Sequence, residues 1–558
     1  MQALYQLSYS PRSCPLRFPF RFPAAASPTL HGSPGLCQIR PGTVFERREV
    51  LSANRARFVP GEPYAVTALE LEQPADARAP SPLRAFVRRR PVACATLACL
   101  VSFAAFWTAQ RLAHVTMIDL MVYRAEGWTA RNGEDLYDMV ATSANLPNTY
   151  PPFAALLFTP LTLVGVREMQ ILATLGNLLL LVAVVHLSLR LAGLPRARPR
   201  TADRGGLRVT YGTPRLAATL ALSAVLVWCE PVWTTLRYGQ INLLLAVLVL
   251  WDMTRKDTNR WAGAGIGVAA GIKLTPALFA VLLALAGLVR AGQRLRTGRG
   301  RGPRTDGPGG VGDPAPGGPR SGGGVRMSGG PGSPWNPWLR QATVATLTFL
   351  ATVVVSAVAL PGDSRRFWTE IVFAADRVGE VEITANQSLR GALARLLHTH
   401  DPGLAWLVVA ALAAAFGLAV TVTALLHGRR AWASVACAAT ALLVSPVSWS
   451  HHWVWCVPMV ILLGSQARRR AAPAGRPDRR WWVTAGVFSL LFCSYALWWV
   501  PHRWHQHEEL HQNAGQMLLS GGYQLAGLAF LLLAARQVFR PAFRRTGNVP
   551  DSRPPAGR

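Results

Sequence analysis

Long apolar stretches recur along this chain of 558 residues, and they limit its fold more than any other feature. A helix needs about 20 apolar residues to cross the roughly 30 Å hydrocarbon core of a bilayer. The candidate segments are 91–112, 168–189, 214–229, 240–253, 261–290, 338–360, 403–427, 431–447, 452–466, 481–500 and 515–536. An α-helix satisfies the hydrogen bonds of its own backbone, whereas lipid tails offer no partners for unpaired backbone groups. The sequence therefore predicts an all-α polytopic membrane protein.

Two of the apolar stretches need separate treatment when the crossings are counted. The stretch 261–290 is long and contains the sequence KLTP at 273–276, so we expect a hairpin of two crossings. The stretch 152–166 is apolar but short, and we expect a re-entrant element there. Twelve crossings result, with both termini in the cytoplasm, and ten or eleven remain open.

The charges of the loops set the orientation. Residues 190–215 carry seven Arg and one Asp, residues 290–340 nine Arg and two Asp, and residues 467–481 six Arg and one Asp. By contrast, 114–150 has five acids and two Arg, and 361–402 has six acids and five Arg. Basic loops stay in the cytoplasm, so 114–150 and 361–402 are predicted outside.

Three segments lack an apolar face. Residues 1–85 and 541–558 are predicted to be disordered cytoplasmic tails, and 297–334, rich in Gly, Pro and Arg, a flexible cytoplasmic linker inside the membrane domain 86–540. The N-terminus has no signal peptide pattern. The net charge of +30 is spread over short clusters between apolar runs. This distribution favours cytoplasmic loops and anionic membrane lipids over a nucleic-acid partner.

Polar residues gather at the outer ends of the apolar segments. Single ionisable groups at such a boundary are often ordinary interfacial residues, but a whole set on one side of the membrane indicates a site. The set is Asp119, Tyr123, Arg124, Tyr150, Arg237, Gln240, Asn242, Arg377, Asn386, Gln387, Arg390, His451 and His452.

Two members of this set suggest acid–base and phosphate chemistry. Asp119 follows the first helix, and a carboxylate there could take a proton from a hydroxyl group. Its alternative is a helix N-cap. Lys273 lies at the predicted helix break and could bind a phosphate, or could instead extend to the membrane boundary. The YPPF sequence at 150–153 predicts a stiff turn into the membrane.

The other outer residues suit a sugar phosphate. Arg377 and Arg390 have guanidinium groups that match phosphate oxygens, and Asn386 and Gln387 have amides that can bridge sugar hydroxyls. His451 or His452 could donate a proton to a phosphate leaving group. Tyr123, Arg124, Tyr150, Gln240 and Asn242 are predicted to support the site.

One motif indicates a different chemistry. HEELH at 507–511 matches the zinc-protease pattern H-E-x-x-H, in which both His share one face of a helix. The match is short, no third ligand is evident, and a solvated loop is the preferred interpretation. We expect no metal and no cofactor.

Six motifs in order resemble a known family. They are DLMVY at 119–123, YPPF at 150–153, GQIN at 239–242, GIKLTP at 271–276, NQSLRG at 386–391 and SPVSWSHHW at 445–453. They are similar to motifs of the actinobacterial polyprenyl-phosphate-mannose-dependent α-(1→2)-mannosyltransferases, glycosyltransferase family 87 of the GT-C superfamily. The resemblance covers about 90–500.

The resemblance implies a GT-C-like bundle of 10–12 transmembrane helices in the bacterial plasma membrane, with its active site on the outer face. It implies transfer of mannose from a polyprenyl-phosphate donor to a lipoglycan acceptor, such as lipomannan, lipoarabinomannan or a phosphatidylinositol mannoside, with inversion. Asp119 would be the base, and some of Lys273, Arg377, Arg390, His451 and His452 would hold the lipid phosphate. The alternatives are another lipid-linked sugar, such as arabinofuranose or glucose, and a transporter or flippase.

Overall fold

The computed structural model describes residues 86, 89–194, 213–299, 336–469, 479–503 and 506–539. Within these ranges the chain is a bundle of helices with one small antiparallel hairpin, β1 (Val140–Ala141) and β2 (Leu146–Pro147). This confirms the predicted all-α polytopic class. The tails 1–85 and 541–558 and nearly all of the linker 297–334 lie outside the described residues.

Seven described helices are long and apolar enough to cross a membrane, and one bent pair of helices could form an eighth span. The seven are α3 (Pro91–Leu112), α6 (Val166–Leu191), α11 (Ala277–Arg299), α12 (Pro337–Ala359), α15 (Gly403–Leu426), α18 (Arg479–Cys493) with the turn that follows it, and α20 (Gly522–Phe539). The pair is α7 (Thr213–Leu226) and α8 (Glu230–Tyr238), with an angle of 79° between them.

Shorter apolar helices account for the rest of the predicted segments. They are α9 (Asn242–Met253), α10 (Ala264–Ile272), α16 (Arg430–Val444) and α17 (Cys456–Arg469). At about 1.5 Å per residue a 12-residue helix such as α9 covers only about 18 Å. The predicted 10–12 crossings therefore include helices that are shorter than the bilayer is thick.

The helix break predicted within 261–290 is present, but the nine residues of α10 cover only about 14 Å and do not cross a membrane by themselves. The α9–α10 loop contacts the starts of α12 and α16, because Arg340 donates to the Asp257 carbonyl and Arg430 pairs with the Asp257 carboxylate. From that loop α10 runs to Lys273, and α11 begins just after it at Ala277. Lys273 lines the cavity described below. The short helices α9 and α10 thus place their polar ends inside the protein.

The position of α10 depends on close backbone contact with α12. Gly267 and Gly271 face α12, and a Cβ atom on them would come within 2.5 Å of the Ala345 carbonyl oxygen and 2.2 Å of Thr352 Oγ1. Small residues at every fourth position allow such approach in membrane helices. The hairpin that carries Lys273 is therefore fixed by contacts that leave no room for a side chain.

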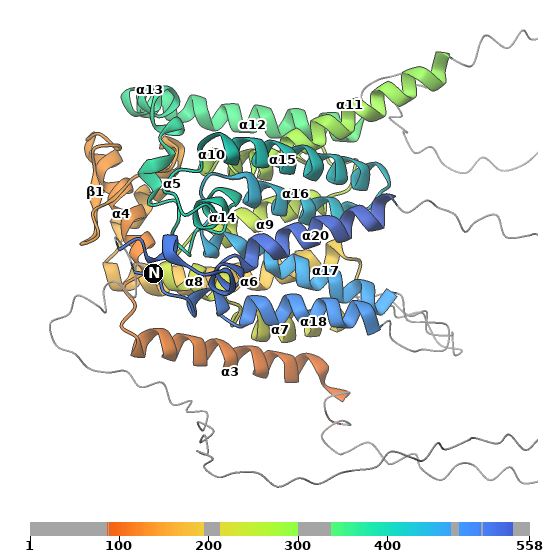
Figure 1. Cartoon of the computed structure of the whole chain (residues 1–558), viewed down its shortest axis with the longest axis horizontal. Coiled ribbons are helices and arrows are strands. Elements are labelled where there is room, and N and C mark those ends of the chain that lie inside the picture. The colour runs from red at the N-terminus through yellow and green to blue at the C-terminus, as the bar shows by residue number, and fades with distance from the viewer. Residues whose placement is uncertain are drawn as a thin grey trace, which may run out of the picture. The chain divides into compact units, whose positions relative to one another are not determined.

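The bundle has a buried centre and lipid-facing edges. Every residue of α16 from Trp432 to Leu443 is buried, whereas α3 buries only a stripe of four residues and lies at the edge of the bundle (Figure 1). An α-helix that is apolar all round and buried belongs inside a large membrane bundle.

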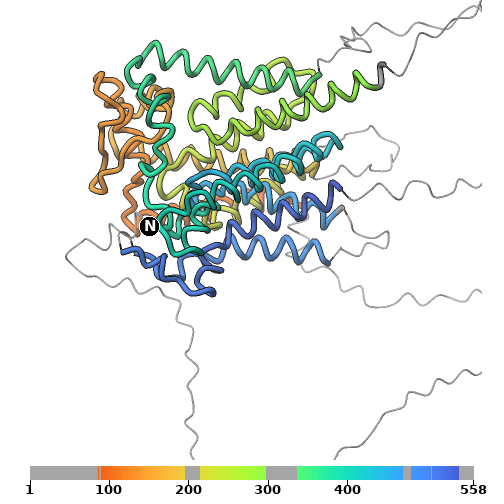
Figure 2. The backbone as a smooth tube through the Cα atoms, turned by 45° about the horizontal axis from the view of Figure 1, so that its top comes forward, coloured from red at the N-terminus to blue at the C-terminus, as the bar shows by residue number. Residues whose placement is uncertain are grey.

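Short elements form one end of the bundle, as the tube view shows (Figure 2). In chain order they are α4 (Ile118–Asn132), the β-hairpin, α5 (Pro152–Phe158), η1 (Thr159–Leu163), α13 (Pro361–Thr369), η2 (Ile371–Phe373), η3 (Ala375–Val378), α14 (Leu389–Leu396), η4 (Ser450–Trp455), η5 (Ala496–Trp498), η6 (Glu508–His511) and α19 (Ala514–Ser520). The predicted re-entrant element 152–166 is α5 with η1, which packs on α4 at this end.

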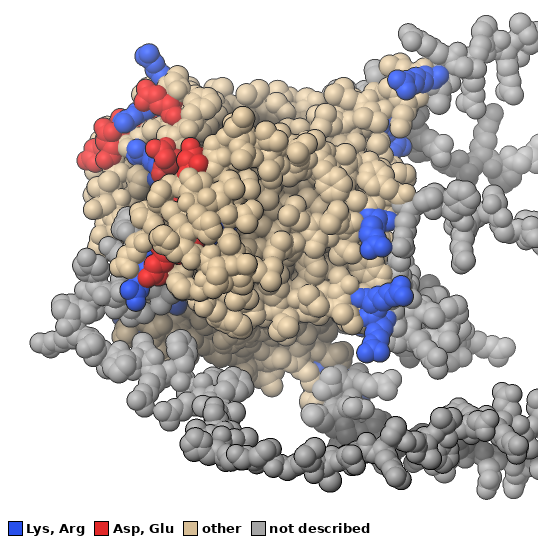
Figure 3. All heavy atoms as spheres, viewed as in Figure 1, with Lys and Arg blue, Asp and Glu red and all other residues tan. Residues whose placement is uncertain are grey.

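Charge separates the two ends (Figure 3). Acidic and basic side chains mix at the end that contains α4 and α13, while the opposite end shows only Lys and Arg in this view. That basic end includes Arg290 and Arg294 of α11, Arg479 of α18 and Arg536 of α20. The preference of Lys and Arg for the cytoplasm places the short elements outside.

Candidate active site

A cavity of ≈ 590 Å³ lies at the outer end of the bundle. Its wall comes from α4, the loop 146–151, the end of α8, the α10–α11 break, the segment 371–378 and η4. Eight of the predicted site residues line it: Asp119, Tyr123, Tyr150, Gln240, Lys273, Arg377, His451 and His452. Sequence segments more than 300 residues apart are thus joined around one polar space.

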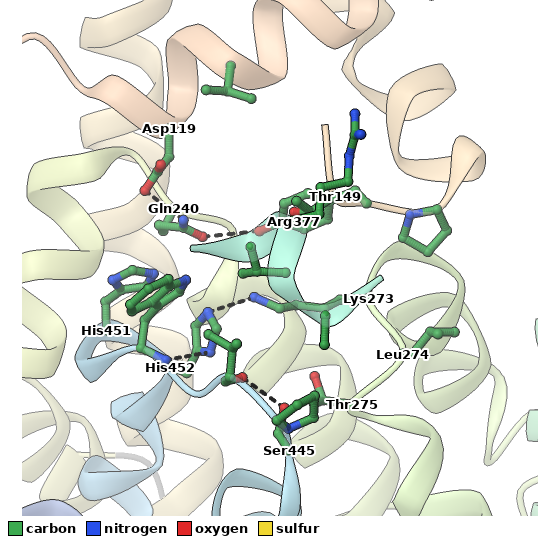
Figure 4. A pocket seen from close by; sticks show the side chains of 18 of the residues that line it. Asp119, Thr149, Gln240, Lys273, Leu274, Thr275, Arg377, Ser445, His451 and His452 are labelled. Carbon is green, nitrogen blue, oxygen red and sulfur yellow. Dashed lines mark hydrogen bonds between the residues drawn. The ribbon is translucent and has the colours of Figure 1, made fainter. Parts of the chain in front are cut away.

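Asp119 lies half-buried in the first turn of α4. The N-cap of this helix is Met117, in the left-handed conformation, and Asp119 makes no capping bond. Instead its Oδ2 accepts a hydrogen bond from Gln240 Nε2 at 2.6 Å (Figure 4). The N-cap alternative is therefore wrong, and the carboxylate is directed at the cavity.

The surroundings of Asp119 tune its proton affinity. Burial raises the pKa of Asp119 to about 6, against the opposing effects of the Gln240 hydrogen bond and the Lys273 charge. A carboxyl group with a pKa near the working pH is suited to accept a proton during a reaction.

Gln240 is held by two tyrosines. Tyr123 OH donates to Gln240 Oε1 at 2.7 Å, and Tyr150 OH lies 3.4 Å from the same oxygen and 2.9 Å from Tyr123 OH. With its oxygen occupied as an acceptor, the amide has to present its nitrogen to Asp119. The three supporting residues therefore orient the carboxylate.

A second carboxyl group lies on the same face of α4. Glu126 follows Asp119 by seven residues, which is two helical turns, and it also lines the cavity. It is fully buried, and neither carboxyl oxygen has a hydrogen-bond partner among the described residues. Burial first, and the Asp119 charge second, raise the pKa of Glu126 well above its usual value. Burial thus favours the neutral carboxylic acid of Glu126 over the carboxylate.

A cationic group faces these carboxyls from the α10–α11 break. Lys273 Nζ lies 2.8 Å from His452 Nε2, and 5.3 Å from the centre of the Tyr150 ring (Figure 4). Burial lowers the pKa of Lys273 to about 8, partly offset by Asp119. Burial, and then Lys273, lower the pKa of His452. An anion entering the cavity would favour the charged form of this pair.

His451 and Asn242 lie beneath this pair. The His451 carbonyl accepts from Asn242 Nδ2 at 3.1 Å and from Thr235 Oγ1 at 2.8 Å, which fixes η4 against α8 and α9. The His451 ring is buried, and its Nε2 has no partner among the described residues. An unpaired buried ring nitrogen beside a cavity is a ready group for a bound ligand.

Arg377 lines the cavity, but part of its guanidinium group is hydrogen-bonded to backbone carbonyls. Its Nε donates to the Asn148 carbonyl at 3.2 Å, and its guanidinium also contacts the Tyr137 carbonyl. These bonds join the segment 371–378 to the first outer loop, so Arg377 has both a structural role and access to the cavity.

Five predicted site residues do not line this cavity: Asn242, described above, and Arg124, Asn386, Gln387 and Arg390. Arg124 donates to the Val164 carbonyl, and Arg390 pairs with Asp401 at 3.5 Å. Asn386 and Gln387 are fully buried and bonded to backbone groups. The amides expected to bind sugar hydroxyls therefore shape the loop instead.

Sequence reasoning did not identify Glu230. This fully buried carboxylate accepts from Thr234, Ser450 and Trp498 at Oε1 and from Tyr523 at Oε2, at 2.8–3.1 Å. It thereby joins α8, η4, η5 and α20 below the cavity and holds the segment with the two histidines. A carboxylate inside an apolar run was the available signal.

These features define a polytopic membrane enzyme, with a carboxylate and a lysine–histidine pair facing one cavity at the outer end. Comparisons with known proteins specify the class. The profile of glycosyltransferase family 87 matches residues 148–293 and 337–446. No solved structure matches this chain.

Two relatives illustrate the match. A polyprenol-phosphate-mannose-dependent alpha-(1-2)-phosphatidylinositol pentamannoside mannosyltransferase from Mycobacterium tuberculosis is 31% identical over 72% of this chain and 79% of its own length. A polyprenol-phosphate-mannose-dependent alpha-(1-2)-phosphatidylinositol mannoside mannosyltransferase from Mycolicibacterium smegmatis is 27% identical over 78% and 87%. The chain belongs to glycosyltransferase family 87. This confirms the resemblance and separates the chain from transporters and zinc proteases.

Proposed function

We propose that this enzyme transfers mannose from a polyprenyl-phosphate donor to a phosphatidylinositol mannoside or a related lipoglycan in the outer leaflet, forming an α-(1→2) bond. The observation that carries the proposal is the cavity in which Asp119, oriented by Gln240, faces the Lys273–His452 pair. The names of the relatives in mycobacteria support the donor, the linkage and the acceptor class.

The proposed reaction is a single displacement with inversion. The acceptor hydroxyl oxygen forms a bond to the anomeric carbon while the bond from that carbon to the phosphate oxygen breaks. The hydroxyl proton passes to Asp119, and the polyprenyl phosphate leaves with the bonding electron pair. A positioned carboxylate base contributes about 10²–10⁴-fold to such a step.

The cationic side of the cavity suits the leaving phosphate. Lys273 would supply positive charge, and His452 and His451 Nε2 would supply hydrogen bonds as negative charge develops on the phosphate. Arg377, at the outer rim, would contact the same group with the N–H groups that the backbone does not use.

The apolar part of the wall suits a lipid-linked donor. Leu274, Leu278, Val372 and Val444 line the same cavity as the polar residues. A polyprenyl chain needs an apolar surface next to its phosphate, whereas a soluble nucleotide sugar does not. The mixture of surfaces therefore supports a lipid donor.

Transfer assays with the purified enzyme test the proposal. Labelled polyprenyl-phosphate mannose would be incubated with phosphatidylinositol mannosides and synthetic mannosides, and the product linkage determined. We expect an α-(1→2)-linked mannosyl product. Donors with arabinofuranose or glucose on the same lipid serve as controls, and use of one of these in place of mannose would overturn the proposed sugar.

A further inference from the structure

The outer loops of the bundle gather three groups of the kind that bind metal ions. Glu382 lies in the loop before α14, His400 follows that helix, and His507 precedes η6. One ligand atom from each lies within 4.8 Å of the others. None of the three lines the large cavity.

The cluster is organised around a single oxygen. Glu382 Oε1 is 2.9 Å from His400 Nδ1 and 2.8 Å from His507 Nδ1, and the two imidazole rings are 4.4 Å apart in an edge-to-face arrangement. Ligands at about 2.0–2.2 Å from a tetrahedral Zn²⁺ ion lie about 3.3 Å from each other. Each of the two Glu382–His distances would therefore lengthen by about half an ångström around such an ion.

The Glu382 side chain is prearranged. Glu382 is 1% exposed, and its loop is fixed from below by Arg395, which donates to the carbonyls of Glu382, Ile383 and Asn386 at 3.0–3.2 Å. The two imidazoles are reachable from solvent, with side-chain exposures of 62% for His400 and 43% for His507. A fixed carboxylate beneath two accessible imidazoles is suited to capture an ion from outside.

Local charge also favours a cation. The carboxyl groups of Glu380, Glu382 and Glu509 lie close enough to His507 to interact with it electrostatically. This concentration of negative charge around two imidazoles attracts either a proton or a metal ion. Because His and carboxylate donors together match Zn²⁺ better than Mg²⁺ or Ca²⁺, which prefer oxygen, the donor set selects a Zn²⁺-type ion.

We propose that Glu382, His400 and His507 form a Zn²⁺-binding clamp that joins the outer loop before α14 to the loop that contains η6. These loops already meet at weaker contacts, since Thr384 N–H donates to Glu509 Oε1 and Gln512 Nε2 to Thr384 Oγ1, both at 3.4 Å. An ion would add a stronger link between them. Its role is to stabilise the outer surface, separate from the transfer reaction.

The clamp differs from the H-E-x-x-H interpretation of the same loop. His507 is in the left-handed conformation with φ 50°, and Glu508–His511 is a 3-10 helix, so His507 and His511 do not share an α-helical face. His507 instead faces partners more than 100 residues away in sequence. The metal-free expectation from the sequence could not include this arrangement.

Zinc titration of the purified, chelator-treated full-length enzyme tests the clamp. We expect one equivalent of Zn²⁺ to bind in calorimetry and to raise the unfolding temperature, while Mg²⁺ does neither. His400→Ala and His507→Ala should each weaken binding by at least about tenfold, because even the loss of an outer-sphere partner costs about 10–100-fold. His511→Ala, in the same exposed loop but outside the cluster, should bind like the unaltered enzyme.

Two results of the zinc titration would overturn the clamp. Equal Zn²⁺ binding by all four proteins would mean adventitious binding elsewhere, and no binding by the unaltered enzyme would leave the cluster as a proton-linked pair; either result overturns the clamp. Mannosyl transfer by His400→Ala and His507→Ala should continue, which separates this test from that of the proposed reaction.

Discussion

Two groups of polar residues lie at the outer end of the bundle, and they differ in what their side chains contact. Asp119 accepts a hydrogen bond from Gln240, Lys273 contacts His452, and all of these side chains border a cavity. Asn386 and Gln387, in the loop before α14, use their side-chain amides to hydrogen-bond backbone groups. Both groups look alike in sequence, since each is polar and follows an apolar run.

This difference shows how residues that could bind a ligand can be distinguished from polar residues that stabilise a loop. The Gln387 amide donates to the Thr384 and Ser520 carbonyls and accepts from the Tyr523 N–H, so no hydrogen-bonding capacity remains for a ligand on the nitrogen side. In the cavity, by contrast, Glu126 and His451 keep polar atoms without partners among the described residues. Hydrogen-bonding atoms that have no partner among the described residues, more than polarity itself, therefore distinguish the site.

The largest expected effect is on turnover in Asp119→Asn. The amide keeps the size of the side chain but cannot accept the acceptor's proton, so kcat should fall by about 10²–10⁴-fold. The abundance of the variant in the membrane should stay normal, and so should donor binding by the purified variant. Asp135→Asn is the matched control, because Asp135 lies in the same outer loop but pairs with Arg366 at the surface. Near-normal turnover in Asp119→Asn would remove it from the mechanism and make Glu126 the next candidate.

A smaller loss is expected for Lys273→Gln. A hydrogen bond to a charged group contributes about 1.5–3 kcal/mol, so kcat/KM for the donor should fall by about ten- to a hundredfold. Steady-state kinetics against donor concentration measure the effect. Lys256→Gln, at an exposed position in the α9–α10 loop, should leave kcat/KM unchanged. Equal values for both variants would contradict a phosphate contact by Lys273.

The pH profile provides a third test. The pKa of Asp119 is raised to about 6 and that of Lys273 lowered to about 8. The base must be deprotonated and the lysine protonated, so kcat/KM should fall below about pH 6 and again above about pH 8, tenfold per pH unit on each side. Lys273→Gln should lose the alkaline fall and keep the acidic one. A profile with the alkaline fall intact in that variant would assign it to another group.

Gln387→Ala should act on stability. The substitution leaves two buried carbonyls and one N–H without their partner, at a cost of about 1–3 kcal/mol each. We expect a clearly lower unfolding temperature, measured in detergent, with kcat per folded molecule nearly unchanged. A kcat loss as large as that of Lys273→Gln would move Gln387 back into the site.

The smallest effect is expected for Arg390→Ala. Its ion pair with the largely exposed Asp401 and its contact with the Trp406 ring at 5.2 Å are together worth about 1 kcal/mol. Kinetic constants should change less than twofold. A strong loss of donor binding would show that Arg390 reaches the phosphate after all.

Hydropathy and charge predicted the architecture well, because lipid requires apolar helix surfaces and the membrane sorts Arg-rich loops to one side. The break at Lys273 was predictable for a similar reason, since Pro276 cannot continue a helix. The short helices α9 and α10 were harder to count as crossings. Their 12 and nine residues are too few to cross a bilayer, although both lie within apolar stretches.

The site was predicted only in part. Asp119, Lys273 and the two histidines could be recognised as ionisable groups at segment ends. The sequence could not show that the Asn386 and Gln387 amides bond to backbone, because those partners are up to 136 residues away. Glu230 was missed for the same reason, since its donors come from α8, η4, η5 and α20.

The cavity at the outer end has a consequence for living cells. In the proposed reaction, protons that Asp119 takes up and releases would exchange with the medium outside the membrane, because the cavity lies among the short elements at the end opposite the basic one. The homeostasis that keeps the cytoplasm near neutral would then not protect this enzyme. In an acidic surrounding, below about pH 6, glycan extension would slow while metabolism inside the cell continued unchanged.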